Sequence, residues 1–178
     1  MFRKLTRRQI LAATVPISVF GLAGLAQAQP LNTLISLDLP SPNTEITDKS
    51  GQSRRLADYA TQPLLINFWA SWCPPCIHEL PALEGLDRAL ADADMGVLLV
   101  GADRKGADFG EAFLADRNIN IRQRSYDPRG ELDRALAVRA MPTSFLMTRQ
   151  GQIIGKVEGA IAWDDPAVIR QLVTMLAA

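Results

Sequence analysis

The two cysteines of the chain, Cys73 and Cys76, form a single C-x-x-C pair around two prolines. A thiolate is a nucleophile and a metal ligand, so such a pair can exchange disulfides, bind zinc or close a static bridge. Zinc takes about four ligands, and the only histidine of the chain is His78. A static bridge over so short a loop constrains the unfolded chain little. We therefore favour a redox-active pair and expect no metal; the static bridge stays open as an alternative.

The local sequence places Cys73 where its thiolate is stabilised. The apolar run Leu64–Trp69 predicts a strand covered on both faces, and a helix is expected from Cys73 to Leu90. Pro74 then falls in the first helical turn, where a missing N–H costs little. The positive end of a helix favours an anion, so Cys73 is the expected attacking thiol. Cys76 lies one turn deeper and would resolve the mixed disulfide.

Further along the chain the pattern predicts an α/β fold. Short extended pieces at 45–47 and 52–55 flank a turn, and 95–102 is expected to be a buried strand. Helices fit 107–116 and 131–138, followed by a hairpin of strands 143–148 and 152–157. A last helix starts at Asp165-Pro166, an N-cap followed by a first-turn proline. The result is one domain over 44–178: an α/β sandwich with a mixed central sheet. It has an N-terminal hairpin extension and a helix-containing insertion.

The first residues differ from the rest in composition. Residues 1–28 hold four basic and no acidic side chains, then an apolar run that ends in Ala26-Gln27-Ala28. This pattern predicts an export signal cleaved after Ala28, and Arg7-Arg8 suit the twin-arginine route as well as an ordinary one. An uncleaved segment would be the only membrane contact. Residues 29–43 are expected to be a flexible lead-in.

The composition of the remaining chain limits its partners. Beyond residue 28 it carries 15 basic and 19 acidic side chains, a net charge of about −4. Nucleic-acid binding needs a basic patch, so we expect no such partner. With 48% apolar residues, the chain can build a core without further cross-links.

The segment Asn67-Phe68-Trp69-Ala70-Ser71-Trp72-Cys73-Pro74-Pro75-Cys76, followed by Glu79 and Pro81, resembles the active-site segment of the thioredoxin superfamily. More narrowly, it resembles the TlpA/ResA-like branch of periplasmic thiol–disulfide oxidoreductases. The resemblance extends from about Thr44 to the C-terminus and includes Met141-Pro142-Thr143. It implies a thioredoxin-like fold with a cis bond before Pro142. Asn67 departs from thioredoxin itself, which has a buried aspartate there; an amide cannot take up a proton.

The resemblance also implies roles for particular residues. Trp72, Met141, Pro142 and Thr143 would contact the substrate, with the Met141 backbone pairing with an extended client segment. Glu79 would tune the cysteines and relay the Cys76 proton, unless it is merely a solvated helix residue. For Trp163 the sequence leaves two places open, near the site or under the last helix.

The implied function is a periplasmic reductase of protein disulfides that uses no cofactor. By resemblance, its clients are apocytochrome c or the copper-site cysteines of respiratory oxidases, and a membrane thiol-electron transporter supplies its electrons. One alternative is a disulfide-forming oxidase; such proteins have a histidine where Pro75 stands. The other is a copper-binding or adaptor module without catalysis, since Cu(I) binds thiolates.

Overall fold

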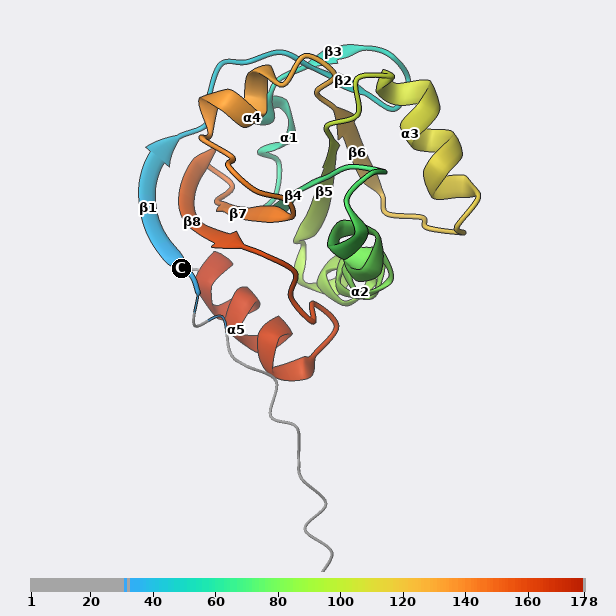
Figure 1. Cartoon of the computed structure of the whole chain (residues 1–178). Helices are drawn as coiled ribbons and strands as arrows, with labels where there is room; N and C mark the ends of the chain where they lie inside the picture. The colour runs from blue at the N-terminus through green and yellow to red at the C-terminus, as the bar shows by residue number, and fades with distance from the viewer. Residues whose placement is uncertain (1–30, 32, 178) are drawn as a thin grey trace, which may run out of the picture.

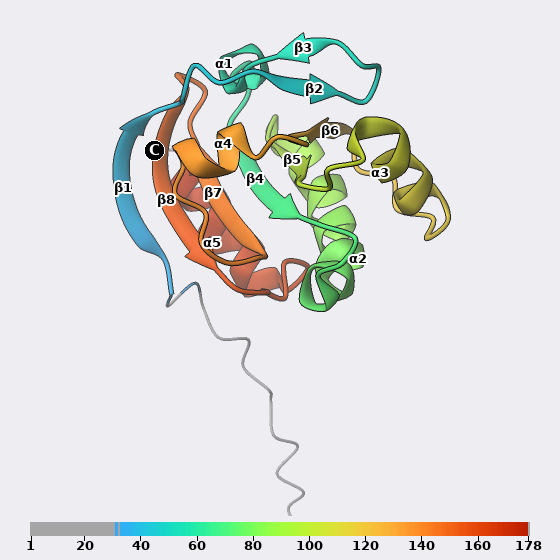
Figure 2. The same cartoon turned by 45° about the horizontal axis from the view of Figure 1, so that its top comes forward.

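The computed structural model describes residue 31 and residues 33–177, so the predicted export signal lies outside the described residues. Within this range eight strands form one mixed sheet, in the spatial order β1-β8-β7-β4-β5-β6-β2-β3 (Figures 1 and 2). The pairs β4–β5 and β5–β6 are parallel, and all other neighbours are antiparallel. The strands are β1 (Ile35–Pro40), β2 (Ile46–Asp48), β3 (Ser53–Arg54), β4 (Leu64–Trp69), β5 (Gly96–Gly101), β6 (Gln123–Tyr126), β7 (Thr143–Met147) and β8 (Gln152–Glu158).

Helices cover both faces of this sheet. On one face pack α2 (Pro74–Leu90), α3 (Gly106–Ala115) and α5 (Pro166–Leu176). The short helices α1 (Leu56–Tyr59) and α4 (Glu131–Ala135) pack on the other, and a 3-10 turn at Ala91–Ala93 follows α2. The expected α/β sandwich with a mixed sheet is therefore correct. Among the described residues, no helix is long and apolar enough to cross a membrane.

The central strands are apolar on both sides because each side is covered by helices. All six residues of β4 are buried, and so are all six of β5. Alternation divides β4 between two cores, with Leu65 and Trp69 facing α2 and Leu64, Ile66 and Phe68 facing α1 and α4. The residue between Leu65 and Trp69 on the α2 face is the polar Asn67.

Three regions differ from the sequence-based expectation. Residues 29–43 were expected to be a flexible lead-in, yet 35–40 form β1, which pairs antiparallel with β8. The apolar residues Ile35, Leu37 and Leu39 alternate with other residues along β1. Because these side chains are only partly covered, the apolar alternation that indicates a strand is weak here. The strand β6 was not predicted, because its sequence Gln-Arg-Ser-Tyr is mostly polar. The helix expected over 131–138 ends at Ala135, and Ala137 has a φ of 51°.

Candidate active site

The dithiol lies where β4 passes into α2. Cys73 is the N-cap of α2, and Pro74 and Pro75 form its first turn. In the structure Cys73 and Cys76 are joined by a disulfide, and the Sγ of Cys73 accepts a hydrogen bond from the Cys76 backbone N–H at 3.3 Å. Cys76 is fully buried and Cys73 nearly so, at 3% exposure. Pro74 and Pro75 have no backbone N–H, so the Cys76 N–H is the donor that faces Cys73 Sγ at the helix start. When the bridge is reduced, this N–H and the positive end of α2 stabilise a Cys73 thiolate.

The loop before Cys73 is fixed by a buried carboxylate. Asp103 follows β5, and its two oxygens accept hydrogen bonds from the backbone N–H and the hydroxyl of Ser71 at 2.8 and 2.7 Å. Because β4 and β5 are parallel neighbours, with Trp69 opposite Gly101, the residues after both strands meet at one sheet edge. Trp72, held between Ser71 and Cys73, is 66% exposed, whereas Trp69 is buried in the core.

The loop before β7 reaches the same edge from the other side. The Met141–Pro142 bond is cis, as expected. Thr143 pairs with Phe68 of β4 and donates its hydroxyl hydrogen to the Ala140 carbonyl oxygen at 2.7 Å. Met141 packs against the core cluster that contains both cysteines, and its backbone N–H and C=O have no hydrogen-bond partner among the described residues. Met141 is thus half-buried, with its peptide unit left unpaired in the described part of the fold.

Glu79 is a buried carboxyl on the first turns of α2, only 4% exposed. It accepts hydrogen bonds from Asn67 Nδ2 at 2.8 Å, from the Ile161 backbone N–H at 3.2 Å and from Trp163 Nε1 at 3.2 Å. Burial raises the pKa of Glu79 to about 7, although the three donors act to lower that pKa. The group is therefore not a solvated helix residue, and it titrates near neutral pH beneath the dithiol.

Two partners of Glu79 were not recognised from the sequence. Trp163 is fully buried and lies at the site, which settles its open position. Asn67 donates through Nδ2 to both Glu79 and the Ser144 hydroxyl, and its Oδ1 has no partner among the described residues. The β4 alternation, which puts Asn67 between Leu65 and Trp69 on the α2 face, was the signal that could have linked it to Glu79.

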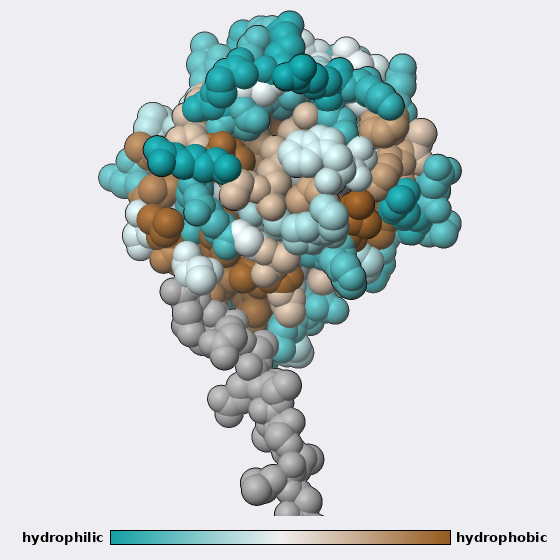
Figure 3. Space-filling model, in the orientation of Figure 1, coloured by the Kyte–Doolittle hydropathy of each residue, from teal (hydrophilic) through white to brown (hydrophobic). Residues whose placement is uncertain are grey.

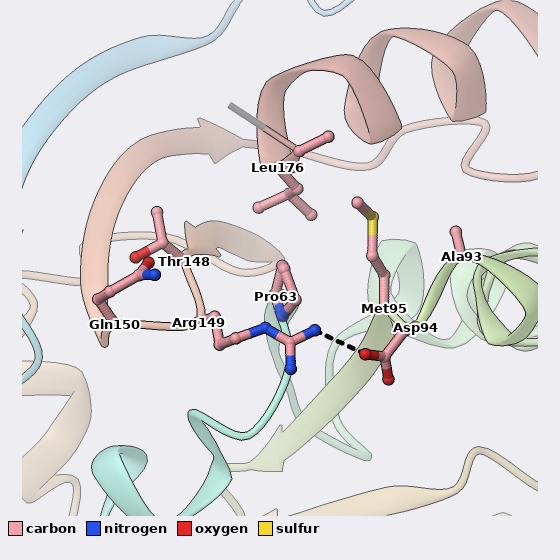
Figure 4. Close-up of a pocket in the computed structure, with 9 residues that line it drawn as sticks. Pro63, Ala93, Asp94, Met95, Thr148, Arg149, Gln150 and Leu176 are labelled. Atoms are coloured by element: carbon pink, nitrogen blue, oxygen red, sulfur yellow. Dashed lines mark hydrogen bonds and ion pairs between the residues drawn. The ribbon is translucent and has the colours of Figure 1, made fainter.

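Other features stand apart from this edge of the sheet. His78 is exposed on α2, and the described residues hold no group of three His, Cys, Asp or Glu side chains suited to a metal. A hollow of about 390 Å³ lies near the start of β4, where Arg149 and Asp94 form an ion pair at 2.6 Å (Figure 4). The six residues of β4 separate the hollow from the cysteines by roughly 20 Å, so it is not part of the redox site.

The comparison with known proteins agrees with this geometry. The Redoxin family matches residues 38–172. The chain belongs to the Redoxin family. It is 28% identical over 67% of its length to the thiol-disulfide oxidoreductase ResA of Bacillus cereus, of which it covers 68%. It is 31% identical over 85% of its length to the thiol:disulfide interchange protein DsbE homolog of Paracoccus denitrificans, of which it covers 86%.

Solved structures place this Redoxin chain in the thioredoxin-like fold. A candidate thiol:disulfide interchange protein DsbE from Chlorobium tepidum superposes with a TM-score of 0.66 at 26% identity, covering 79% of this chain and 97% of that one. A DsbF homologue from Corynebacterium diphtheriae gives 0.65 at 20% identity, covering 81% and 93%. The protein is a TlpA/ResA-like thiol–disulfide oxidoreductase, with Cys73 and Cys76 at disulfide distance.

Proposed function

We propose that this oxidoreductase works as a reductase of protein disulfides in the periplasm. The observation that carries the proposal is the buried carboxyl of Glu79 beneath the dithiol. A strongly oxidising pair needs a stabilised thiolate in its reduced form. An ionised carboxylate near the cysteines opposes that stabilisation by like-charge repulsion, and Pro75 adds no compensating cation. The balance favours a low reduction potential.

In the proposed reaction, Cys73, Glu79 and Cys76 act one after another. The Cys73 thiolate attacks one sulfur of a client disulfide; the client S–S bond breaks, a mixed disulfide forms and one client thiolate leaves. Glu79 accepts the proton of the Cys76 thiol, directly or through an intervening group, because its pKa of about 7 suits both uptake and release. Cys76 then attacks the Cys73 sulfur and releases the second client thiolate. Two electrons pass to the client, and the Cys73–Cys76 disulfide remains.

The client contact we propose involves Trp72 and the Met141-Pro142-Thr143 loop. An extended client strand pairs with the free Met141 peptide unit while the exposed Trp72 indole covers the neighbouring side chain. Cysteine pairs of apocytochrome c, or of a respiratory copper site, are the proposed clients. The relatives' names, DsbE and ResA, support disulfide exchange and say nothing of these clients.

The proposed location depends on residues 1–28, which lie outside the described residues. Their basic start, apolar run and Ala-Gln-Ala site support export, and a membrane thiol-electron transporter is the proposed reductant. Cell fractionation with mass measurement of the exported chain tests both points. A product beginning at residue 29 in the periplasmic fraction is expected; an intact chain in the cytoplasm would contradict export.

The deciding experiment is the reduction potential of the pair, equilibrated with glutathione or dithiothreitol at pH 7. We expect a value at or below about −200 mV, and a higher, more oxidising value for Glu79→Gln. The control is Glu131→Gln, which removes a more exposed carboxylate on α4 and leaves the potential unchanged. A wild-type value near about −120 mV would instead identify an oxidase, and a pair that never exchanges would identify a structural bridge.

A further inference from the structure

A hollow of about 490 Å³ lies beside the loop that leads into Cys73. Ser71 and Trp72 form one wall, and Arg104, Lys105 and Phe109 form the opposite wall. The two walls follow the parallel strands β4 and β5, which explains why residues far apart in sequence meet here. The hydrogen bonds from Ser71 to Asp103 join the walls, so the hollow is already shaped before a client arrives.

The charge of this hollow is opposite to that of the rest of the domain. Arg104 and Lys105 are exposed, and neither forms an ion pair within the described residues. The Lys105 ammonium lies 4.4 Å from the centre of the Phe109 ring, which directs it along this wall. The carboxylate of Asp103 is buried and bonded to Ser71, and Asp108, one turn further on, does not line the hollow. Within the described residues, Arg104 and Lys105 are thus left without a carboxylate partner, although the chain beyond residue 28 has a net charge of about −4.

The other flank of the dithiol carries charges of both signs. Arg139 lies exposed two residues before Met141, and the carboxylate of Glu158, opposite Thr143 on β8, lies near enough to interact with it. The face of the molecule that carries the β4–α2 loop is apolar to neutral at its centre and hydrophilic along its upper rim (Figure 3). An apolar centre beside the two cations Arg104 and Lys105 suits a polypeptide in which a carboxylate lies near an otherwise uncharged contact segment.

We propose that the hollow between Trp72 and Arg104-Lys105 is a specificity subsite for an acidic side chain of the client polypeptide, close to the client cysteine that Cys73 attacks. This inference rests on the proposed reductase function and adds to it a choice among clients. A carboxylate there would pair with the two cations, while its aliphatic stem packs on the Trp72 and Phe109 rings. A basic residue at the same place would be repelled.

The test compares short peptides that differ only in charge. Each peptide holds one cysteine in a mixed disulfide with uncharged thiopyridine and is flanked by aspartates, serines or lysines. The reduced protein gives two electrons to this disulfide, releasing the peptide thiol and a thiopyridone whose absorbance reports the rate. At low ionic strength we expect the acidic peptide to react about three- to tenfold faster than the basic one, a difference that added salt reduces.

The variant Arg104→Glu/Lys105→Glu reverses this preference if the two cations form the subsite. The ratio of acidic to basic rates is compared, because it cancels any change in the reactivity of Cys73 itself. Lys49→Glu/Arg170→Glu is the matched control: it makes the same change in net charge at exposed cations on the β2–β3 turn and on α5. This control keeps the wild-type ratio if the effect is local.

The possible outcomes distinguish the acidic subsite from the proposed reductase function. A reversed ratio in the double variant and an unchanged ratio in the control support the acidic subsite. If the serine peptide is reduced but acidic and basic peptides react equally, or the double variant keeps the wild-type ratio, the subsite is refuted and the reductase function stands. If no peptide is reduced, the proposed function itself is refuted.

Discussion

At the scale of single residues, the environment of Glu79 combines two opposing effects. Burial raises its pKa to about 7, and donors from Asn67, Ile161 and Trp163 prevent the pKa from rising further. A carboxyl with fewer donors would stay protonated at neutral pH, and an exposed one would stay ionised. The observed arrangement therefore keeps both protonation states accessible next to the thiols, which is the property an acid–base relay needs.

The raised pKa of Glu79 predicts a pH-dependent stability. A group with a pKa of about 7 when folded and 4.5 when unfolded stabilises the folded state fully below 4.5, and this contribution is lost as pH rises through 7. For the oxidised protein, we expect Glu79 to lower the free energy of unfolding by up to about 3 kcal/mol over that range. Denaturant unfolding at a series of pH values measures this change in the free energy of unfolding.

Glu79→Gln should lose most of this pH dependence, because a neutral amide has no proton to release on ionisation. Glu131→Gln, at a more exposed carboxylate, is the control. Its free energy of unfolding should change with pH as steeply as that of the wild type. If the free energy of unfolding depends on pH equally in the wild type and in Glu79→Gln, the Glu79 carboxyl does not titrate between pH 4.5 and 7.

At the scale of elements, the site depends on where neighbouring strands end. The strands β4 and β5 run parallel, so the Cys73 loop and the Asp103 loop emerge at the same edge. The strand β7 runs antiparallel to β4, so the residues before β7 reach that edge too. Helix α2 then begins there, and its positive end faces the sulfur of Cys73. Three connections thus converge because of strand direction alone.

Asp103→Ala should disturb this edge specifically. It removes two hydrogen bonds to Ser71, and we expect a loss of about 1–3 kcal/mol in the free energy of unfolding. The loop that carries Trp72 and Cys73 also loses its anchor, so the rate constant for a peptide disulfide should fall. Both are measured, by denaturant unfolding and by thiopyridone release.

Asp87→Ala is the matched comparison for this prediction. Asp87 is equally buried and bonded to Arg122 and to the Val97 backbone, but it lies near the far end of α2. It should destabilise the protein without changing the rate constant. If both variants lower stability alike and neither changes the rate, Asp103 is only structural.

At the scale of the whole molecule, β1 and the hairpin β2–β3 extend the sheet beyond its central strands (Figure 2). Strand β1 covers the edge of β8, and Leu31 just before it is buried beside α5, where its N–H donates to Gln171. The new edge is itself interrupted by a register shift between Ser36 and Leu39 and closed by Pro40. Such features discourage edge-to-edge association.

Removal of β1 should therefore lower the stability of the protein and cause it to self-associate. A chain beginning at residue 43 exposes the edge of β8 and loses the Leu31 contact, so we expect a lower denaturant midpoint and dimers or larger species. Size-exclusion chromatography and denaturant unfolding provide the measurements. A chain beginning at residue 29 is the control; if the two chains behave alike, β1 has no role in the stability of the domain.

Local sequence signals were enough to predict the dithiol and the central strands of the fold. Continuous apolar runs predicted β4 and β5, and a C-x-x-C pair with prolines at a helix start predicted the dithiol, because these signals depend on neighbouring residues alone. Polar β6 and partly covered β1 were missed, since their stability comes from partners distant in sequence. The surroundings of the dithiol became visible only in three dimensions: the donors around Glu79, and the hollow that Trp72 shares with Arg104 and Lys105. Burial and proximity depend on how strands are ordered and directed, which no local pattern encodes.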